Sequence, residues 1–308
     1  MDPIFIQIGP LAIRWYGLLI AAGVLGGTFW ALRLAKRRNL DSDRLLDAAL
    51  WLVIAGVVGA RLVYVLTSPS AYFGPGGNLL NAFKVWEGGV SIHGAVIGVM
   101  LALWIYARRY KLNMWAYLDV LTPLGALGIM GGRLGNVMNG TDTGGRLTNL
   151  GIGFNWPDPG TPFLGAVGRF VFGENLWQFR PPACSAVAFG EPCTVHFTQL
   201  YGFAVGAILL GIVLWALARS KAPGYVFWVF VLWYSILRNV IEEPFRDNPL
   251  GWQVYLNEQT GIGLFTITQL ASIPIMLVAL FMLLTLGVGK GEPSSPARGG
   301  PSAKPSKA

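Results

Sequence analysis

Apolar residues along the chain gather into seven stretches, separated by mostly short polar segments. Each stretch has about 20 residues, enough for an α-helix to span the roughly 30 Å hydrocarbon core of a bilayer. The pattern therefore predicts an all-α polytopic membrane protein with seven transmembrane helices, at 15–33, 45–66, 90–107, 115–137, 198–218, 224–243 and 264–287. A longer loop region, 138–197, follows the fourth predicted helix.

The composition supports this class of protein. Hydrophobic residues make up 54% of the 308 positions and charged residues only 12%, too few to cover the surface of a soluble domain. A net charge of +8 would raise nucleic acid as a partner of a soluble protein. Here the basic residues lie mainly in short loops between apolar stretches, so they indicate membrane orientation, and no nucleic acid is expected.

Basic residues differ in density between successive loops. Most of the 23 lysines and arginines lie in RLAKRRNLDSDR, RRYK, RSK and the C-terminal tail. Because positively charged loops stay in the cytoplasm, the N-terminus is predicted outside and the C-terminus inside. Residues 290–308, rich in Pro, Ser and Gly, predict a disordered basic tail behind a seven-helix domain over 1–289.

Two further features concern packing and cross-links. Glycines recur at four-residue spacing in the predicted helices, for example Gly94 with Gly98 and Gly128 with Gly132. Such pairs let helix backbones approach closely, which predicts a compact bundle. The cysteines, at 184 and 193, both fall in the outer loop region, where either a local disulfide or two free thiols would fit. Neither cysteine is assigned a catalytic role.

Polar side chains gather at the outer ends of six predicted helices. They are Tyr16, Arg61, His93, Arg133, Asn136, Asn139, His196, Gln199, Tyr201, Arg238 and Glu242. A charge at the bilayer centre costs about 2.5–3.5 kcal/mol, so intramembrane ionisable groups usually pair or line a wet cavity. Each also has a structural alternative: Arg133 can reach the headgroups, Asn136 can bridge two helices, and His93 can simply be packed. Their common depth favours a shared site.

The chemistry of these groups suits an anionic lipid headgroup. Arginine matches a phosphate bidentately and stays charged, and histidine, with a pKa near ~6.5, exchanges a proton at neutral pH. No metal-ligand spacing and no glycine-rich phosphate loop is present in the sequence, so neither metal nor cofactor is predicted. Arg238 and Glu242, four residues apart, can equally well only neutralise one another. At the inner helix ends, Asp47 and Asp119 are expected to be isolated.

One segment carries a family resemblance. GGRLGNVMNG at 131–140, followed by GGR at 144–146, resembles the signature of the bacterial prolipoprotein diacylglyceryl transferases. The likeness continues in order through WYGL at 15–18, SIHGA at 91–95, HFTQLY at 196–201, LRNVIEEPFR at 237–246 and FTITQLASIPIML at 265–277. The resemblance implies seven spans in the bacterial inner membrane, with the active site toward the periplasm.

The resemblance also implies a reaction and its partners. The family transfers the sn-1,2-diacylglyceryl group of phosphatidylglycerol to the lipobox cysteine of a preprolipoprotein signal peptide. A thioether forms and glycerol 1-phosphate leaves, without metal or cofactor. Phosphatidylglycerol, the precursor protein and membrane lipids are the partners expected for this chain.

Site residues follow from the matching positions. The resemblance gives catalytic roles to His93, Arg133, Arg238, Glu242 and Tyr16. It gives substrate-binding roles to Asn136, Asn139, Asp142, Gly145, Arg146, Arg246, Gln199 and Tyr201. Arg133 and Arg238 are expected on the phosphate, with Glu242 orienting Arg238. His93 is the candidate general base, although the group that accepts the thiol proton is left open.

The chain departs from the family pattern in several places. The stretch NGTDTGGR is one residue longer than usual, with Thr141 at the place of a glutamate that Asp142 is expected to replace. Ala95 stands for a glycine, Phe197 for a proline and Gly202 for a glutamate. Two alternatives therefore stay open: a non-catalytic relative, and a transporter or receptor that binds an anionic solute. A transporter should carry polar groups across the midplane, and here they stop in the outer half.

Overall fold

A computed structural model describes residues 4–8, 11–74, 77–85, 88–139, 144–156, 181–188, 190–219, 222–247 and 252–286. Within these ranges, seven helices are long and apolar enough to cross a membrane, which confirms the predicted spans. They are Gly17–Arg37, Ser42–Thr67, Ile92–Tyr110, Met114–Val137, Thr198–Arg219, Tyr225–Phe245 and Ile267–Leu286. The predicted disordered tail at 290–308 lies outside the described residues.

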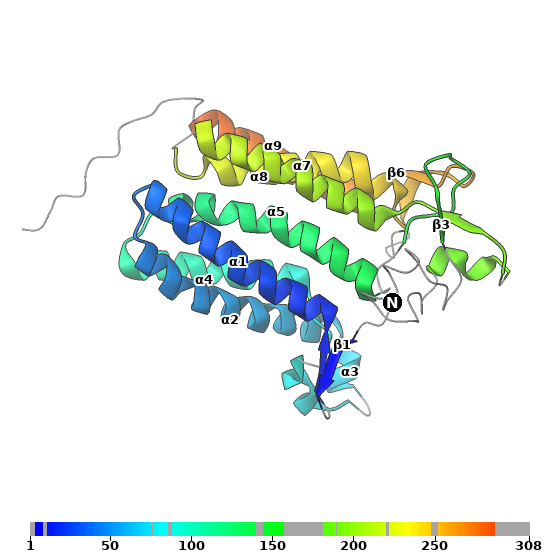
Figure 1. The fold of residues 1–308 in the computed structure, drawn as a ribbon, viewed down its shortest axis with the longest axis horizontal. Helices are drawn as coiled ribbons and strands as arrows, with labels where there is room; N and C mark the ends of the chain where they lie inside the picture. The colour runs from blue at the N-terminus through cyan, green and yellow to red at the C-terminus, as the bar shows by residue number, and fades with distance from the viewer. Residues whose placement is uncertain are drawn as a thin grey trace, which may run out of the picture.

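The spans form a bundle built around one central helix. The elements are α1 (Trp15–Arg37), α2 (Ser42–Thr67), α4 (Ile92–Tyr110), α5 (Met114–Asn139), α7 (Thr198–Arg219), α8 (Tyr225–Leu237) and α9 (Ile267–Leu286). Figure 1 shows α5 between a group formed by α1, α2 and α4 and a group formed by α7, α8 and α9. Buried apolar side chains hold α5 to both groups: Leu118 and Val120 face the first, and Ala126 faces the second.

One of the predicted glycine pairs forms a close helix contact. A Cβ added to Gly94 would lie 2.2 Å from the carbonyl oxygen of Gly59, and one added to Gly98 would lie 2.2 Å from another carbonyl oxygen of α2. Only glycine permits this approach of two backbones. By contrast, Cβ atoms on Gly128 and Gly132 would meet nothing within 4 Å. The close approach predicted from the spacing is therefore present at Gly94 and Gly98 but not at Gly128 and Gly132.

Short strands and turns lie outside the spans. Among the described residues, three antiparallel two-stranded sheets pair β1 (Ile4–Ile8) with β2 (Leu11–Arg14), β3 (Phe154–Trp156) with β4 (Cys193–Val195), and β5 (Gln253–Asn257) with β6 (Ile262–Thr266). Short helical elements are α3 (Pro69–Phe73), η1 (Leu79–Phe83) and η3 (Pro182–Ala186). Figure 1 shows β1, β3 and β6 at the same end of the bundle.

A disulfide joins Cys184 to Cys193, the first residue of β4. Both cysteines are fully buried beside Trp156 and Val195. Of the two alternatives that the sequence left open, the structure therefore contains the local bridge. The disulfide links η3 covalently to the two-stranded sheet of β3 and β4.

Arg61, in the C-terminal part of α2, holds the loop that leads to α4. Its guanidinium donates to four backbone carbonyl oxygens, those of Asn81, Ala82, Gly88 and Gly89, at 2.5–2.8 Å. The residue is 7% exposed. Because backbone carbonyls from two parts of one loop bind it, Arg61 acts as a structural clamp.

At the opposite end of the bundle, Asp119 of α5 caps another helix. Its carboxylate accepts hydrogen bonds from the backbone N–H groups of Gly224 at 2.9 Å and Phe227 at 3.0 Å, at the start of α8. The Nη1 atom of Arg38 lies 3.7 Å from the same carboxylate. The expectation that Asp119 is isolated is therefore wrong. Its partners lie 81 residues before it and over 100 residues after it, where no local pattern could reveal them.

Candidate active site

The segment that ends α8 departs from α-helical geometry. The helix continues into a π-helical turn, η4 (Arg238–Glu242), and then a 3₁₀ turn, η5 (Glu243–Phe245). The backbone N–H of Glu243 donates to the carbonyl oxygen of Arg238, five residues earlier. Single π-helical turns of this kind occur frequently at functional sites. Pro244 follows at once and, lacking an N–H group, cannot continue the helix.

The π turn changes which glutamate pairs with Arg238. In an α-helix the residue four positions on, Glu242, would share its face. In the structure, Nη2 of Arg238 instead lies 3.6 Å from Oε2 of Glu243, five positions on, and Nη1 donates to the Tyr234 hydroxyl at 2.9 Å. The expected ion pair between Arg238 and Glu242 is therefore corrected, because the wider turn brings Glu243 to that place.

Glu242 joins two other arginines. Its side chain is 1% exposed, and Oε1 accepts a hydrogen bond from Nη2 of Arg133, on α5. Nη1 of Arg246 lies 3.4 Å from the same oxygen. One buried carboxylate thus links the C-terminal part of α5 to the segment after α8. We call Arg133, Glu242, Arg246, Arg238 and Glu243 the arginine cluster.

Helix α7 approaches the cluster through a glycine. Gly202 is buried, and a Cβ added to it would lie 2.4 Å from Nε of Arg133 and 2.9 Å from Oε2 of Glu242. The guanidinium of Arg133 therefore passes directly over the α7 backbone. In the sequence, Gly202 stands out only as a departure from the family pattern, and that departure falls at the contact with Arg133.

The GGR motif is woven between two other segments. The Gly145 N–H donates to the carbonyl oxygen of His196 at 2.9 Å, and the Arg146 N–H donates to that of Phe245 at 3.0 Å. Gly145 forms an isolated antiparallel bridge with Arg246. A Cβ on Gly145 would lie 2.1 Å from the His196 carbonyl oxygen, so only glycine fits there. We call these backbone contacts of Gly145 and Arg146 the seam. They bring the predicted residues Gly145, Arg146 and Arg246 together.

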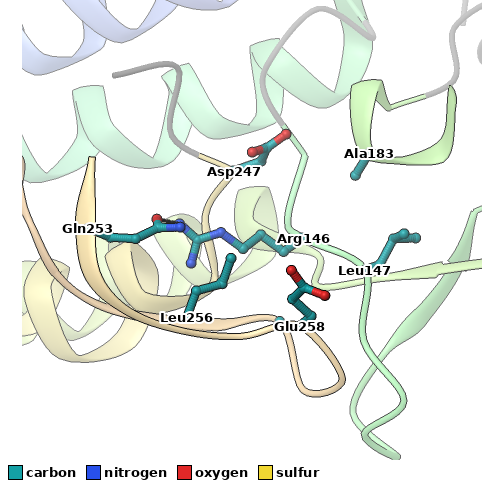
Figure 2. Close-up of a pocket in the computed structure, with 8 residues that line it drawn as sticks. Arg146, Leu147, Ala183, Asp247, Gln253, Leu256 and Glu258 are labelled. Atoms are coloured by element: carbon teal, nitrogen blue, oxygen red, sulfur yellow. Dashed lines mark hydrogen bonds between the residues drawn. The ribbon is translucent and has the colours of Figure 1, made fainter. Parts of the chain in front are cut away.

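On the other side of the seam, Arg146 lines a pocket of about 410 Å³. Figure 2 shows its side chain extending toward Gln253, whose Oε1 accepts from Nη2, and Nη1 donates to the Pro244 carbonyl oxygen at 3.2 Å. Burial lowers the pKa of the Arg146 guanidinium from its ordinary value, and the nearby carboxylates of Asp247 and Glu243 oppose that shift. Arg146 thus holds the β5–β6 hairpin against the seam.

The fully buried His196 pairs with the partly buried Tyr201 beside the seam. Nε2 of His196 lies 2.7 Å from the carbonyl oxygen of Thr260, which can only accept, so Nε2 carries the proton. Nδ1 lies 3.2 Å from the Tyr201 hydroxyl, which therefore donates to it. Burial lowers the pKa of His196, and the Arg146 charge adds to that effect, while the Thr260 carbonyl opposes it. This arrangement favours a neutral, structural histidine.

Gln199, one turn before Gly202 on α7, is 3% exposed. Its Oε1 has no hydrogen-bond partner among the described residues. A buried amide oxygen without a donor is costly, so it marks a place where a bound group can donate.

The remaining predicted residues are placed to different extents. His93, the second residue of α4, has an exposed side chain and forms no hydrogen bond or ion pair with the arginine cluster among the described residues. Asn136 lies on α5 one turn after Arg133 and is partly buried. The side chains of Tyr16 and Asn139, and all of Asp142, lie outside the described part of the structure.

Fold and site together define a class of protein. It is a seven-span membrane protein in which one end of the bundle carries a cluster of partly buried arginines around buried carboxylates, of a kind suited to anionic ligands.

The family model described as prolipoprotein diacylglyceryl transferase matches residues 3–285, nearly the whole chain, and the chain therefore belongs to this family. Among similar proteins, one from Thermus thermophilus is 47% identical over 289 residues, covering 94% of this chain and 99% of the relative. One from Deinococcus radiodurans is 45% identical over 293 residues, covering 93% and 86%. One from Thermoanaerobacter is 35% identical over 283 residues, covering 92% and 93%. All three are named phosphatidylglycerol--prolipoprotein diacylglyceryl transferase.

Proposed function

We propose that this protein transfers the diacylglyceryl group of phosphatidylglycerol to the lipobox cysteine thiol of a preprolipoprotein. Membership of the family and the names of the relatives support the reaction. The observation that carries the proposal to this chain's own residues is the Arg133–Glu242–Arg246 contact. It lies at the end of the bundle to which the hairpins and the disulfide belong, which we take as the periplasmic end.

The cluster suits a phosphodiester in both charge and geometry. Its three guanidiniums outnumber its two carboxylates, so these five groups together favour an anion. Guanidinium groups bind phosphate oxygens through paired N–H donors, and they do so more strongly where water is excluded. Arg133 and Arg246 share one carboxylate oxygen, so an incoming phosphate can replace part of an existing contact. We assign Arg133 and Arg238 to the phosphate, with Glu242 orienting Arg133.

In the chemical step, the nucleophile is the cysteine of the protein substrate, so the enzyme mainly has to stabilise the leaving group. The substrate cysteine sulfur attacks the glyceryl carbon that bears the phosphate, a C–S bond forms, and the C–O bond to phosphate breaks. Glycerol 1-phosphate leaves with the electron pair, and the cysteine proton passes to a base, for which His93 is the candidate. Preorganised donors that stabilise such developing charge typically contribute about 3–4 kcal/mol each. Arg133 and Arg238 supply them here.

Two further polar groups complete the proposed binding site. The partnerless Oε1 of Gln199 can accept a hydrogen bond from a glycerol hydroxyl of the lipid headgroup. Asn136, one turn from Arg133, can hold an ester oxygen without adding charge. Tyr16, Asn139 and Asp142 keep their proposed roles on the strength of the family resemblance alone.

Complementation tests the proposal. A bacterial strain depleted of its own diacylglyceryl transferase should regain growth and lipoprotein processing when it expresses this chain. Arg133→Ala and Arg238→Ala should insert normally and fail to rescue. A wild-type chain that inserts but does not rescue would contradict the enzymatic proposal and favour a non-catalytic relative or a solute-binding protein. The role of His93 has a separate test, since His93→Gln with most of its turnover in detergent would exclude it as the obligatory base.

A further inference from the structure

Gly202 leaves no room for a side chain beside the arginine cluster. An added Cβ would meet three atoms at short range: Nε of Arg133 at 2.4 Å, Cδ of Arg133 at 2.9 Å, and Oε2 of Glu242 at 2.9 Å. All three distances are shorter than real Cβ contacts, so something must move if position 202 carries a side chain. All three atoms belong to the two side chains whose contact carries the proposed function.

What would move is predictable from the identity of these atoms. They lie toward the ends of long side chains, and none is backbone, so Arg133 can swing away without a shift of α5 or α7. The fold would then survive while the Arg133–Glu242 contact breaks. A methyl group at position 202 would thus pack where the Arg133 side chain now lies, and Arg133 would lose its position beside Glu242.

Gly206, one turn further along α7, offers a matched contrast. It is also buried and also faces α5. A Cβ there would lie 2.6 Å from Cγ of Met130, but also 3.2 Å from two backbone atoms of α5, the Ala126 oxygen and the Met130 nitrogen. Backbone atoms cannot swing away, so a side chain at position 206 must push the two helices apart.

We propose that Gly202 is a positioning residue for the reaction. Its missing side chain keeps open the space in which the Arg133 guanidinium reaches Glu242, and so fixes the donor that receives the lipid phosphate. The inference rests on the proposed function, because it takes Arg133 as the phosphate-binding donor. Gly202 itself touches neither substrate nor reacting atoms in this proposal.

The test compares Gly202→Ala with Gly206→Ala in the full chain purified in detergent. Transfer from phosphatidylglycerol in mixed micelles to a synthetic peptide with a lipobox cysteine gives kcat and KM, and thermal unfolding gives Tm. We expect Gly202→Ala to keep Tm within about 2 °C of wild type. Its kcat/KM should fall by about 100-fold, the effect of misplacing a reacting group by roughly 1 Å. Gly206→Ala should show the reverse: a Tm lower by at least about 4 °C and a kcat/KM within about threefold.

A double-mutant cycle separates positioning from general disruption. If Gly202 acts through Arg133, adding Gly202→Ala to an Arg133→Ala chain should leave the residual kcat/KM unchanged within about twofold. Equal losses in the two backgrounds would overturn the proposal. So would a Gly202→Ala chain that retains more than about a third of wild-type kcat/KM.

Failure of the proposed function would look different, because the wild-type chain itself would then transfer nothing. In that case, the rise in Tm on adding phosphatidylglycerol reads the same contact without turnover. Gly202→Ala should lose that rise and Gly206→Ala should keep it. Equal stabilisation of both variants would overturn the role of Gly202 independently of the reaction.

Discussion

Each end of the bundle buries a carboxylate, and the two carboxylates are held in different ways. Asp119 is fully buried and is bound by backbone N–H groups of Gly224 and Phe227, with Arg38 alongside. Glu242 is almost as buried, but the partners described for it are the side chains of Arg133 and Arg246. The hydrogen-bond donors to Asp119 are backbone groups with fixed positions, whereas the donors described for Glu242 are flexible side chains.

This difference separates structure from function. Backbone donors at the start of a helix cannot leave without unfolding it, so Asp119 stabilises the bundle whether or not a ligand is present. Guanidinium groups can exchange a carboxylate oxygen for a phosphate oxygen, because both are acceptors of similar geometry. A buried carboxylate bound by side chains can thus be replaced at its partners by a ligand. One bound by backbone groups only stabilises the fold.

The largest effect is expected at Glu242. Glu242→Gln removes the charge that fixes Arg133 and Arg246, so kcat/KM for transfer should fall by about 100-fold. The measurement is steady-state transfer to a lipobox peptide in detergent. Glu258→Gln, which changes an exposed carboxylate at the same end, serves as the control and should stay within about twofold. Equal activity of the two variants would remove the distinction drawn above.

A smaller effect, on stability rather than activity, is expected at Asp119. Asp119→Ala leaves the N–H groups of Gly224 and Phe227 without their acceptor, which should lower the free energy of unfolding by about 1–3 kcal/mol. Thermal unfolding in detergent measures this change. The kcat per folded molecule should stay within about threefold of wild type. A large loss of kcat without a change in stability would show that the end of the bundle near Asp119 takes part in the reaction.

The smallest effect is a pH dependence at His196, which is held partly by backbone and partly by a side chain. Burial lowers its pKa below 6.5, so the folded protein prefers the neutral ring. Stability from this residue is therefore fully present above pH 6.5 and is lost as the pH falls through 6.5, where the unfolded chain binds a proton first. The Tm should fall between pH 7.5 and 5.5, and His196→Gln should show a shallower slope. An identical slope in both chains would contradict this assignment.

The features that could be predicted from the sequence are those encoded by neighbouring residues. The seven spans follow from run length alone, and the Gly94–Gly98 pair from its spacing. The contact of Glu242 with Arg133 and the partners of Asp119 could not be predicted, because these groups lie far apart along the chain. The pairing of Arg238 failed for another reason: i to i+4 logic assumes an α-helix, and η4 is a π turn. Gly202 was visible only as an unexpected residue, since the absence of a side chain has meaning only beside its neighbour.

The two ends of α5 and α8 also have a mechanical consequence. Asp119 fastens the start of α8 to α5, and Glu242 fastens the segment beyond its end to Arg133 on the same helix. The two helices therefore resemble beams clamped together at both ends, with the Ala126 contact between them. These contacts therefore set the separation of the backbones that carry Arg133 and Glu242 before any lipid binds. That separation limits the size of the group that can enter between the two side chains.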